Sequence, residues 1–189
     1  MSDYTFSKVF KNINFSEQEF PTGEYEECSF QNCIFRNSNL SHSKFINCDF
    51  ESCDLSSIKL GETSLQEITI KNSKLLGVVF SDCTNFLLSI HFIHCLLDFS
   101  SFYQLNLKDF KFKNCSLKDV DFTEANLKKV AFEDCNLIGA TFENTVLESA
   151  DFRSATNYSI NPAKNKIKKA KFSSQEVKGL LDSYDILIE

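Results

Sequence analysis

The sequence lacks tryptophan and has only one methionine, three histidines, two prolines and five glycines. Five glycines are too few for a glycine-rich phosphate-binding loop, and the low glycine and proline content argues against a flexible linker. Three histidines leave little material for metal or general-base chemistry. No segment approaches the ~20 consecutive apolar residues of a membrane-spanning helix. The 189 residues therefore indicate one domain of ordinary size with no obvious reactive centre.

Basic side chains are in the minority, with 20 Lys and Arg against 26 Asp and Glu, so the net charge is −6. Direct nucleic-acid binding through a basic surface is disfavoured, because phosphate contacts need clustered Lys and Arg. Residues 1–10 also lack the charged-then-apolar order of a signal peptide. We therefore expect a cytoplasmic protein that does not contact a membrane and keeps its eight cysteines as reduced thiols.

Phenylalanine is abundant, with 20 residues, and large apolar residues recur at every fifth position. Neither a helix nor a strand produces a sustained period of five, and a heptad is excluded too. The pattern breaks once, between Phe80 and Phe92, where the phase slips by two residues. The first series is Phe10, Phe15, Phe20, Tyr25, Phe30, Phe35, Leu40, Phe45, Phe50, Leu55, Leu60, Leu65, Ile70, Leu75 and Phe80. The second is Phe92, Leu97, Phe102, Leu107, Phe112, Leu117, Phe122, Leu127, Phe132, Leu137, Phe142, Leu147 and Phe152.

A small residue usually stands two positions before each large one, and all eight cysteines occupy this place in the repeat. They are Cys28, Cys33, Cys48, Cys53, Cys83, Cys95, Cys115 and Cys135. A thiol at such a position serves as a small apolar filler. Disulfides and metal sites need cysteines that match one another rather than a repeat, so core filling is favoured over both alternatives.

A backbone that turns a corner every five residues would point both the small and the large residue inward. Successive coils would then stack about 4.8 Å apart and pair their backbones, which leaves unpaired edges only at the two ends. In the second series Phe and Leu alternate with a period of ten. Four sides of five residues would stack Phe on Phe, whereas three sides would stack Phe on Leu, although mixed columns would also pack. We predict an all-β solenoid over residues 1–157, with a phase break near residues 81–92.

Residues 158–189 lose the repeat and are predicted to form a C-terminal capping and dimerisation segment. Ser173 and Glu176 fit a capping box ahead of a short helix, and residues 186–188 are predicted to form a strand. A solenoid needs a cap because its last coil exposes core side chains and backbone groups. The tail has more apolar groups than a small cap requires, so we also expect a homodimer. Its predicted interface residues are Val177, Leu180, Leu181, Tyr184, Ile186 and Ile188.

Catalytic motifs are missing: the chain has no GxSxG, HExxH, CxxC or P-loop pattern. His91 and His94 lie near Cys83 and Cys95, which leaves a metal site as an alternative. Exposed corner histidines are the favoured interpretation, because both cysteines belong to the inward-facing pattern. A regular solenoid also offers no obvious ligand pocket. We therefore expect a binding protein without catalytic residues, metal or cofactor.

Acidic residues concentrate on one side when the pentapeptides are assigned to four sides. That side has one lysine, Lys59, and the acidic residues Glu19, Glu62, Asp82, Asp121, Glu124 and Glu143. A column with one negative side resembles duplex DNA in outline and field, and a basic groove shaped for a duplex should attract it. The alternative is that the acidic side only keeps the protein soluble.

Several segments resemble the A-(D/N)-L-x-x signature of the pentapeptide-repeat family, over roughly residues 5–157. They are CSFQN, CIFRN, CDFES, CDLSS, VDFTE, ANLKK and ADFRS. The resemblance implies a right-handed quadrilateral β-helix. The tail NYSINPAKNKIKKAKF, joined to a Phe- and Cys-rich body, is similar to the Qnr, MfpA and McbG-like branch. This branch implies a DNA mimic that pairs end to end, binds DNA gyrase or topoisomerase IV, and protects it from quinolones or peptide toxins.

The expected partner-binding residues combine the acidic side with residues around the phase break. They are Glu62, Asp82, His91, His94, Asp121, Glu124 and Glu143. Since the phase slips by only two residues, we expect any loop at the break to be short. The alternative function is that of a generic interaction scaffold whose partner is not a topoisomerase.

Overall fold

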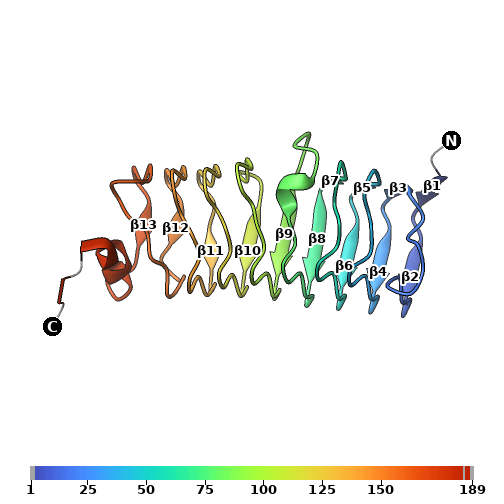
Figure 1. Ribbon diagram of the computed structural model, residues 1–189, viewed down its shortest axis with the longest axis horizontal. Coiled ribbons are helices and arrows are strands. Elements are labelled where there is room, and N and C mark those ends of the chain that lie inside the picture. Colours follow the sequence, from blue (N-terminus) through green and yellow to red (C-terminus); the bar gives the residue numbers. More distant parts are fainter. Residues whose placement is uncertain (1–2, 185, 188–189) are drawn as a thin grey trace.

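A computed structural model of the chain describes residues 3–184 and 186–187. It is a column of stacked coils with the two ends of the chain at opposite ends of the column (Figure 1). All of its strands are short, from two to four residues. They are β1 (Asp3–Phe6), β2 (Val9–Lys11), β3 (Gly23–Glu26), β4 (Ser29–Gln31), β5 (Lys44–Ile46), β6 (Asp49–Glu51), β7 (Ser64–Gln66), β8 (Ile68–Lys71), β9 (Ile90–Ile93), β10 (Lys111–Lys113), β11 (Phe132–Glu133), β12 (Asp151–Phe152) and β13 (Lys171–Phe172).

The coils have four sides, each held by parallel pairing between residues about one coil apart. The β2 side contains the sheet β11-β10-β9-β8-β6-β4-β2 and, beyond it, the pair β12-β13. The β1 side contains the sheet β1-β3-β5-β7 and, after the break, the bridges from Asn106 to Lys166. Isolated bridges hold the other two sides, which we call the Asn14 side (Asn14 to Thr156) and the Asn39 side (Asn39 to Thr141). The predicted four-sided, all-β solenoid is therefore confirmed.

Along the chain, each coil visits the β1, β2, Asn14 and Asn39 sides in that order. We number the coils by the residue at the centre of the β2 side. From the first coil to the ninth these are Phe10, Phe30, Phe50, Ile70, Phe92, Phe112, Phe132, Phe152 and Phe172. The step is 20 residues except from Ile70 to Phe92, where it is 22. The two extra residues thus belong to the fifth coil.

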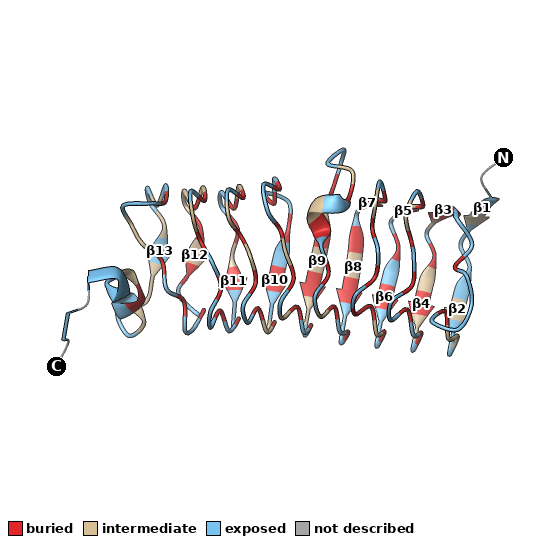
Figure 2. Ribbon diagram, viewed as in Figure 1, coloured by how far each residue is buried: buried red, intermediate tan, exposed pale blue. Residues whose placement is uncertain are grey.

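After the phase break, large side chains of successive coils stack like on like, as the alternation of Phe and Leu predicted, whereas before it Phe45 aligns with Leu65 and Phe50 with Ile70. The rings of Phe112 and Phe132 lie 5.3 Å apart, and those of Phe132 and Phe152 lie 4.9 Å apart. Leu107 and Leu127 are fully buried in the neighbouring stack of side chains, on the β1 side. Buried and exposed residues alternate along each coil (Figure 2). This continuous core offers apolar burial in every coil, which is the main stabilising term in such a fold.

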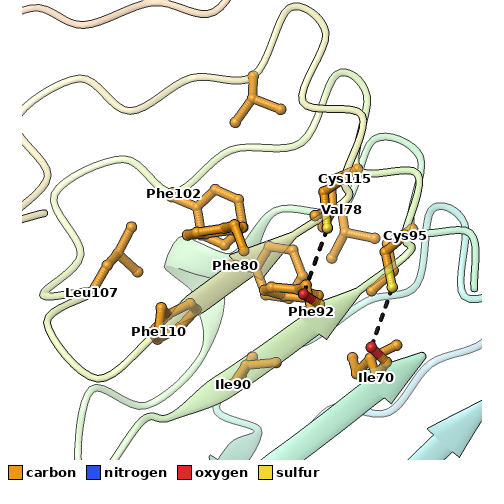
Figure 3. Packing of buried hydrophobic residues seen from close by; sticks show 14 of the residues in the cluster. Ile70, Val78, Phe80, Ile90, Phe92, Cys95, Phe102, Leu107, Phe110 and Cys115 are labelled. Atoms are coloured by element: carbon orange, nitrogen blue, oxygen red, sulfur yellow. Dashed lines mark hydrogen bonds between the residues drawn. The ribbon is translucent and has the colours of Figure 1, made fainter. Parts of the chain in front are cut away.

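The eight cysteines are all free and buried, which agrees with the prediction of core-filling thiols. The structure adds a hydrogen bond that the sequence did not reveal. In Figure 3, dashed lines join the thiol of Cys95 to the carbonyl oxygen of Ile70 and that of Cys115 to the carbonyl oxygen of Phe92. The sulfur–oxygen distances are 3.3 and 3.6 Å. Ser100 donates equivalently to Leu75 at 2.7 Å. The position therefore favours a small side chain with a donor that links one coil to the preceding one.

These thiols are expected to resist modification in the folded protein. Burial raises the pKa values of Cys48, Cys53 and Cys83 to about 12, so these thiols stay protonated at pH 8, and the thiolate is the reactive form. We expect reaction with Ellman's reagent to be about 100-fold or more slower in the native protein than in urea, where all eight cysteines react. Rapid modification of several thiols in the native protein would contradict this arrangement.

The corners of the coils explain many of the polar residues between the inward-facing ones. Most corners have a residue in the left-handed region, which asparagine tolerates better than most other residues. Asn32, Asn72 and Asn114, for example, have φ values of 52°, 50° and 52°. The bulky residues Leu87 and Phe99 also have positive φ values, and both are exposed.

The phase break forms a short loop that stands out from the column. A 3-10 turn, η1 (Phe80–Asp82), precedes it and β9 follows it, and Figure 1 shows the chain between them projecting beyond the neighbouring turns. We call residues 84–88 the break loop. Leu88 is buried, whereas Phe86 and Leu87 are 72% and 62% exposed. Counting back five residues from Phe92 would place Leu87 in the core, but Leu88 is the residue that enters it. The segment before Leu88 is therefore one residue longer, which lets the loop project with only two extra residues in the coil.

The stacked coils continue past residue 157, where the sequence analysis placed the boundary. Strand β13 pairs with β12, so residues 158–172 extend the column by part of another coil. One of the two hydrogen bonds of the predicted capping box forms: the backbone N–H of Glu176 donates to Ser173 Oγ at 3.2 Å, whereas the Glu176 carboxylate accepts from the Asn157 N–H at 3.2 Å. The predicted helix is wrong: the chain forms two 3-10 turns, η2 (Val177–Leu180) and η3 (Asp182–Tyr184). Residues 186–187 are not in a strand, and Ile188 lies outside the described residues.

Close packing against the last coil explains why this segment is not an α-helix. Gly179 lies so near Tyr158 that a Cβ at this position would overlap the Tyr158 carbonyl oxygen. The backbone N–H of Ile160 donates to the carbonyl of Gly179 at 2.8 Å. A segment of this length also gains too few helical hydrogen bonds to offset the cost of helix nucleation. The turns therefore follow the surface of the column instead of forming a separate helix.

Candidate partner-binding surface

The Asn39 side brings together the acidic residues that the repeat assigned to one side. Asp121 pairs in parallel with Ser101 and Thr141 on this side. At the corner that follows it, the N–H of Glu62 donates to the carbonyl of Asp82 at 3.0 Å, and that of Glu124 to Glu143 at 2.8 Å. Glu19 lies one coil before Asn39 by the same period. Lys59 lies among these acidic residues, and Lys164 of the tail joins them at the C-terminal end.

The charge on the Asn39 side is spread along the column. From the coil of Glu19 to that of Glu143 there are six steps of about 4.8 Å, which span about 29 Å. Six carboxylates over this distance give about one charge per 5 Å, compared with one per ~1.7 Å in duplex DNA. The surface therefore has the sign and elongated shape of a duplex at a lower charge density.

Hydrogen bonds differ among these carboxylates and single out Asp121 and Glu124. Asp121 accepts from the Thr123 N–H at 2.9 Å, and Glu124 accepts from Gln104 Nε2 at 2.7 Å. Both donors are neutral, so they fix the carboxylates without reducing their charge. In contrast, Glu143 lies 2.9 Å from Lys164 Nζ, and Glu62 lies 3.2 Å from His42 Nδ1. Asp121 and Glu124, on one coil, thus provide the strongest pair of oriented negative charges.

His91 and His94 lie away from these carboxylates, on and next to the β2 side. His91 is in β9, aligned with Thr69 and Lys111, and His94 is at the corner that follows with φ 54°. The β2 and Asn39 sides are opposite sides of the coil, so the predicted contact set divides into two surfaces. Burial and the neighbouring Lys111 lower the pKa of His91, so this side chain is neutral at pH 7.

The alternative of a metal site near the break receives no support from the geometry. Cys83 and Cys95 are buried in the core, whereas His91 belongs to the outward-facing positions of β9. Within residues 3–184 and 186–187, no group of three or more His, Cys, Asp or Glu side chains is placed to hold a metal ion. In the same part of the chain, no helix has the length and apolar character needed to cross a membrane.

The C-terminal end of the column presents apolar side chains. Among the predicted interface residues, Val177, Leu181, Tyr184 and Ile186 are exposed, whereas Leu180 packs against the core. Ile188 lies outside the described residues. Leu187, which the sequence analysis did not select, is 95% exposed. The tail thus combines one anchoring leucine with an exposed apolar end.

Comparison with known proteins identifies the repeat. A family model described as "Pentapeptide repeat region" matches residues 5–80 and 85–161. The unmatched residues 81–84 lie at the phase break. No curated protein matches the sequence.

Solved structures with the same fold include two trypsin-treated variants of QnrB1, described as a plasmid-mediated fluoroquinolone resistance protein. One has a TM-score of 0.61 and 15% sequence identity, and the match covers 96% of this chain and 98% of the QnrB1 chain. The other has a TM-score of 0.52 and 17% sequence identity, and the match covers 99% of this chain and 100% of the QnrB1 chain. HetL from the cyanobacterium Nostoc sp. strain PCC 7120, described as involved in heterocyst differentiation regulation, has a TM-score of 0.52 and 14% identity, with 90% and 86% covered. At these identities the likeness concerns the fold alone.

Proposed function

Because the chain belongs to the pentapeptide-repeat family, we propose that it is a DNA mimic that binds a bacterial type II topoisomerase, DNA gyrase or topoisomerase IV. The main support is the row of carboxylates along the Asn39 side of a straight column. The fold of QnrB1, a fluoroquinolone resistance protein, adds support. In this proposal the acidic side enters a basic groove of the enzyme that otherwise holds a duplex.

The proposed mechanism is competition and steric displacement with no covalent step, so the chain acts as a binding protein and not as an enzyme. Long-range attraction between the acidic side and a basic groove accelerates the encounter, and salt weakens it. By occupying the groove, the protein prevents the enzyme from holding DNA in the state that quinolones or peptide toxins exploit. Rescue of gyrase supercoiling in the presence of a quinolone would be the functional result.

Reversing both oriented charges is expected to weaken binding. In the double variant Asp121→Lys, Glu124→Lys, two attractive contacts become repulsive, so we expect the Kd for gyrase at 0.1 M salt to rise about tenfold or more. The matched control is Asp49→Lys, Glu51→Lys, which makes the same charge change at two exposed positions of β6 on the opposite side. Equal loss of binding in both variants would show that only net charge matters, and no loss in either would reject the Asn39 side as the contact.

We also propose that two chains pair end to end through the C-terminal segment. Leu180 is anchored in the core, so it holds Val177, Leu181 and Tyr184 at the end of the column. Covering these exposed apolar groups against a second copy removes them from water. Sedimentation of the full chain at micromolar concentration tests this pairing, and a monomer under these conditions would contradict it.

A second candidate function is a scaffold for a partner other than a topoisomerase. The likeness in fold to HetL, whose described role is in heterocyst differentiation regulation, favours it, because that TM-score equals one of those for QnrB1. A pull-down with gyrase over a range of salt concentrations separates the two functions. Capture that declines with salt supports the DNA mimic, and absence of capture at low salt supports the scaffold.

A further inference from the structure

The β1 side has an uneven distribution of charge along the column. Near its N-terminal end, Glu24, Glu26 and Glu27 belong to the second coil, and near the opposite end Lys166, Lys168 and Lys169 belong to the ninth. The break loop, which has no charged residue, separates the two halves. The side is therefore acidic at one end and basic at the other, although its acidic and basic residues are similar in number.

The outward-facing residues of each coil on this side give a sequence of formal charges. The second coil has three negative charges, the third has one positive charge from Lys44, and the fourth has one negative charge from Glu67. The fifth coil has none, and in the sixth Lys108 and Asp109 cancel. The remaining coils have two positive charges (Lys128 and Lys129), one negative charge (Glu148) and three positive charges (Lys166, Lys168 and Lys169).

We propose that a second copy of this chain docks antiparallel on the β1 side, with the twofold axis between the fifth and sixth coils. In this register the second coil faces the ninth, the third faces the eighth and the fourth faces the seventh. Every charged coil then meets a coil of opposite sign, and the symmetry of the pair repeats each contact. Moving the axis onto the fifth coil would place the second coil against the eighth and the third against the seventh, where like charges repel. Charge thus favours this register over the one with the axis on the fifth coil.

The shape of the β1 side supports the same register. A groove of about 860 Å³ lies beside the break loop, and its lining includes Leu87, Lys108, Phe110, Lys129 and Ala131. Its lining comes from the third to the seventh coils, mainly the fifth, sixth and seventh, and from both the β1 and β2 sides. With the twofold axis between the fifth and sixth coils, the break loop of one copy lies opposite the sixth coil of the other, where this groove is. The exposed side chains of Phe86 and Leu87 are then placed to enter it.

The predicted association is weak and depends on salt. Four of these charges already form two ion pairs within the chain, since Lys44 lies 3.0 Å from Glu24 and Lys128 lies 2.9 Å from Glu148. Exposed ion pairs contribute little free energy, but complementary rows determine the orientation and register of a contact. The burial of Phe86 and Leu87 in the partner's groove supplies the apolar part. This inference does not depend on the proposed binding to a topoisomerase.

Charge-swap variants of the full chain test the proposal by sedimentation velocity. An acid-reversed variant has Glu24→Lys, Glu26→Lys and Glu27→Lys, and a base-reversed variant has Lys166→Glu, Lys168→Glu and Lys169→Glu. Each variant alone places like charges between the second and ninth coils, so we expect side-by-side association at 0.1 M salt to weaken about tenfold or more. An equimolar mixture restores opposite charges at both ends of the pair and is expected to recover wild-type association.

The control variant Asp49→Lys, Glu51→Lys, Asp134→Lys has the same change in net charge as the acid-reversed variant, at exposed positions on and next to the β2 side. It should associate like the wild type, and circular dichroism establishes that each variant is folded. The substitution Phe86→Ser changes no charge and should also weaken association. Failure of the mixture to recover association overturns the proposal. Wild-type association that disappears completely when only the C-terminal apolar residues are changed also overturns it.

Discussion

Replacing Phe112 with alanine is expected to lower the free energy of unfolding by about 3–5 kcal/mol. The Phe112 side chain is 1% exposed. Its ring stacks on Phe92 at 5.5 Å and on Phe132 at 5.3 Å, and it meets Phe102 and Phe122 edge to face at 5.8 and 6.1 Å. Truncation leaves a cavity at mid-column that the flanking coils cannot close, because their own backbone pairing fixes their separation. Urea denaturation followed by circular dichroism measures the change.

The matched control for this variant is Phe99→Ala. Phe99 is 61% exposed at a corner, so its truncation should change the free energy of unfolding by no more than about 0.5 kcal/mol. Each coil of a solenoid contacts mainly its two neighbours, so a weakened sixth coil should also allow the two halves of the column to unfold in separate steps. Similar losses in both variants would show that the stacked rings are not the main source of stability.

Replacing Asn165 with leucine is expected to cost about 2–4 kcal/mol, although the substitution makes a buried position more apolar. Asn165 Oδ1 accepts from the Thr145 N–H at 2.8 Å, and Asn165 Nδ2 donates to the carbonyls of Phe142 and Asn161 at 2.9 and 3.0 Å. Leucine has a similar volume but leaves a buried N–H and two carbonyls without these partners. Thermal unfolding measures the loss, since the destabilisation should lower the Tm by several degrees.

The variant Asn106→Leu is the control for the buried asparagine. Asn106 points outward on the β1 side and is exposed, so leucine there should change stability by no more than about 0.5 kcal/mol. If Asn165→Leu were as stable as this control, the hydrogen bonds that join Asn165 to the seventh and eighth coils would contribute little. The final coil would then be held mainly by Ile167 and Phe172, which pack against the core.

The regular part of the fold follows from the sequence because each repeat satisfies the same two conditions. A large apolar residue and a small one must both face inward, and this requirement alone places Phe112 in the core and Cys115 beside it. The alternation of Phe and Leu after the break favours four sides, because like residues then stack, although Phe45 on Leu65 shows that unlike residues also pack. The hydrogen bond of Cys115 to the preceding coil could not be inferred, since a small apolar filler satisfies the same spacing.

The irregular parts were harder to predict because they depend on contacts between distant residues. The pattern at Ser173 and Glu176 forms one of the two hydrogen bonds of a capping box, but the close contact of Gly179 with Tyr158 holds the following residues in a 3-10 turn. Asp82 and His94 are near in sequence, yet the β1 and β2 sides of the fifth coil lie between them and place them at different corners. The prediction that His91 and His94 share a surface with the acidic residues was therefore wrong, because it relied on closeness in sequence.

The acidic Asn39 side could be predicted because position within the five-residue period determines the side of each residue. The asymmetry of the β1 side could not be seen in the same way. Its acidic and basic residues nearly balance in number, and a count by side conceals that Glu24 and Lys168 lie near opposite ends. The groove beside Leu87 also depends on how far the break loop projects, which the two-residue phase slip does not specify.

Competition with duplex DNA tests the proposed DNA mimicry most directly. Gyrase is mixed with fluorescently labelled protein, and binding is followed by fluorescence anisotropy while unlabelled linear duplex is added. If the Asn39 side occupies the DNA groove, the apparent Kd of the protein should rise linearly with the concentration of duplex, and the Asp121→Lys, Glu124→Lys variant should bind about tenfold or more weakly. Simultaneous binding of the protein and DNA, with no change in the affinity of either, would contradict the account.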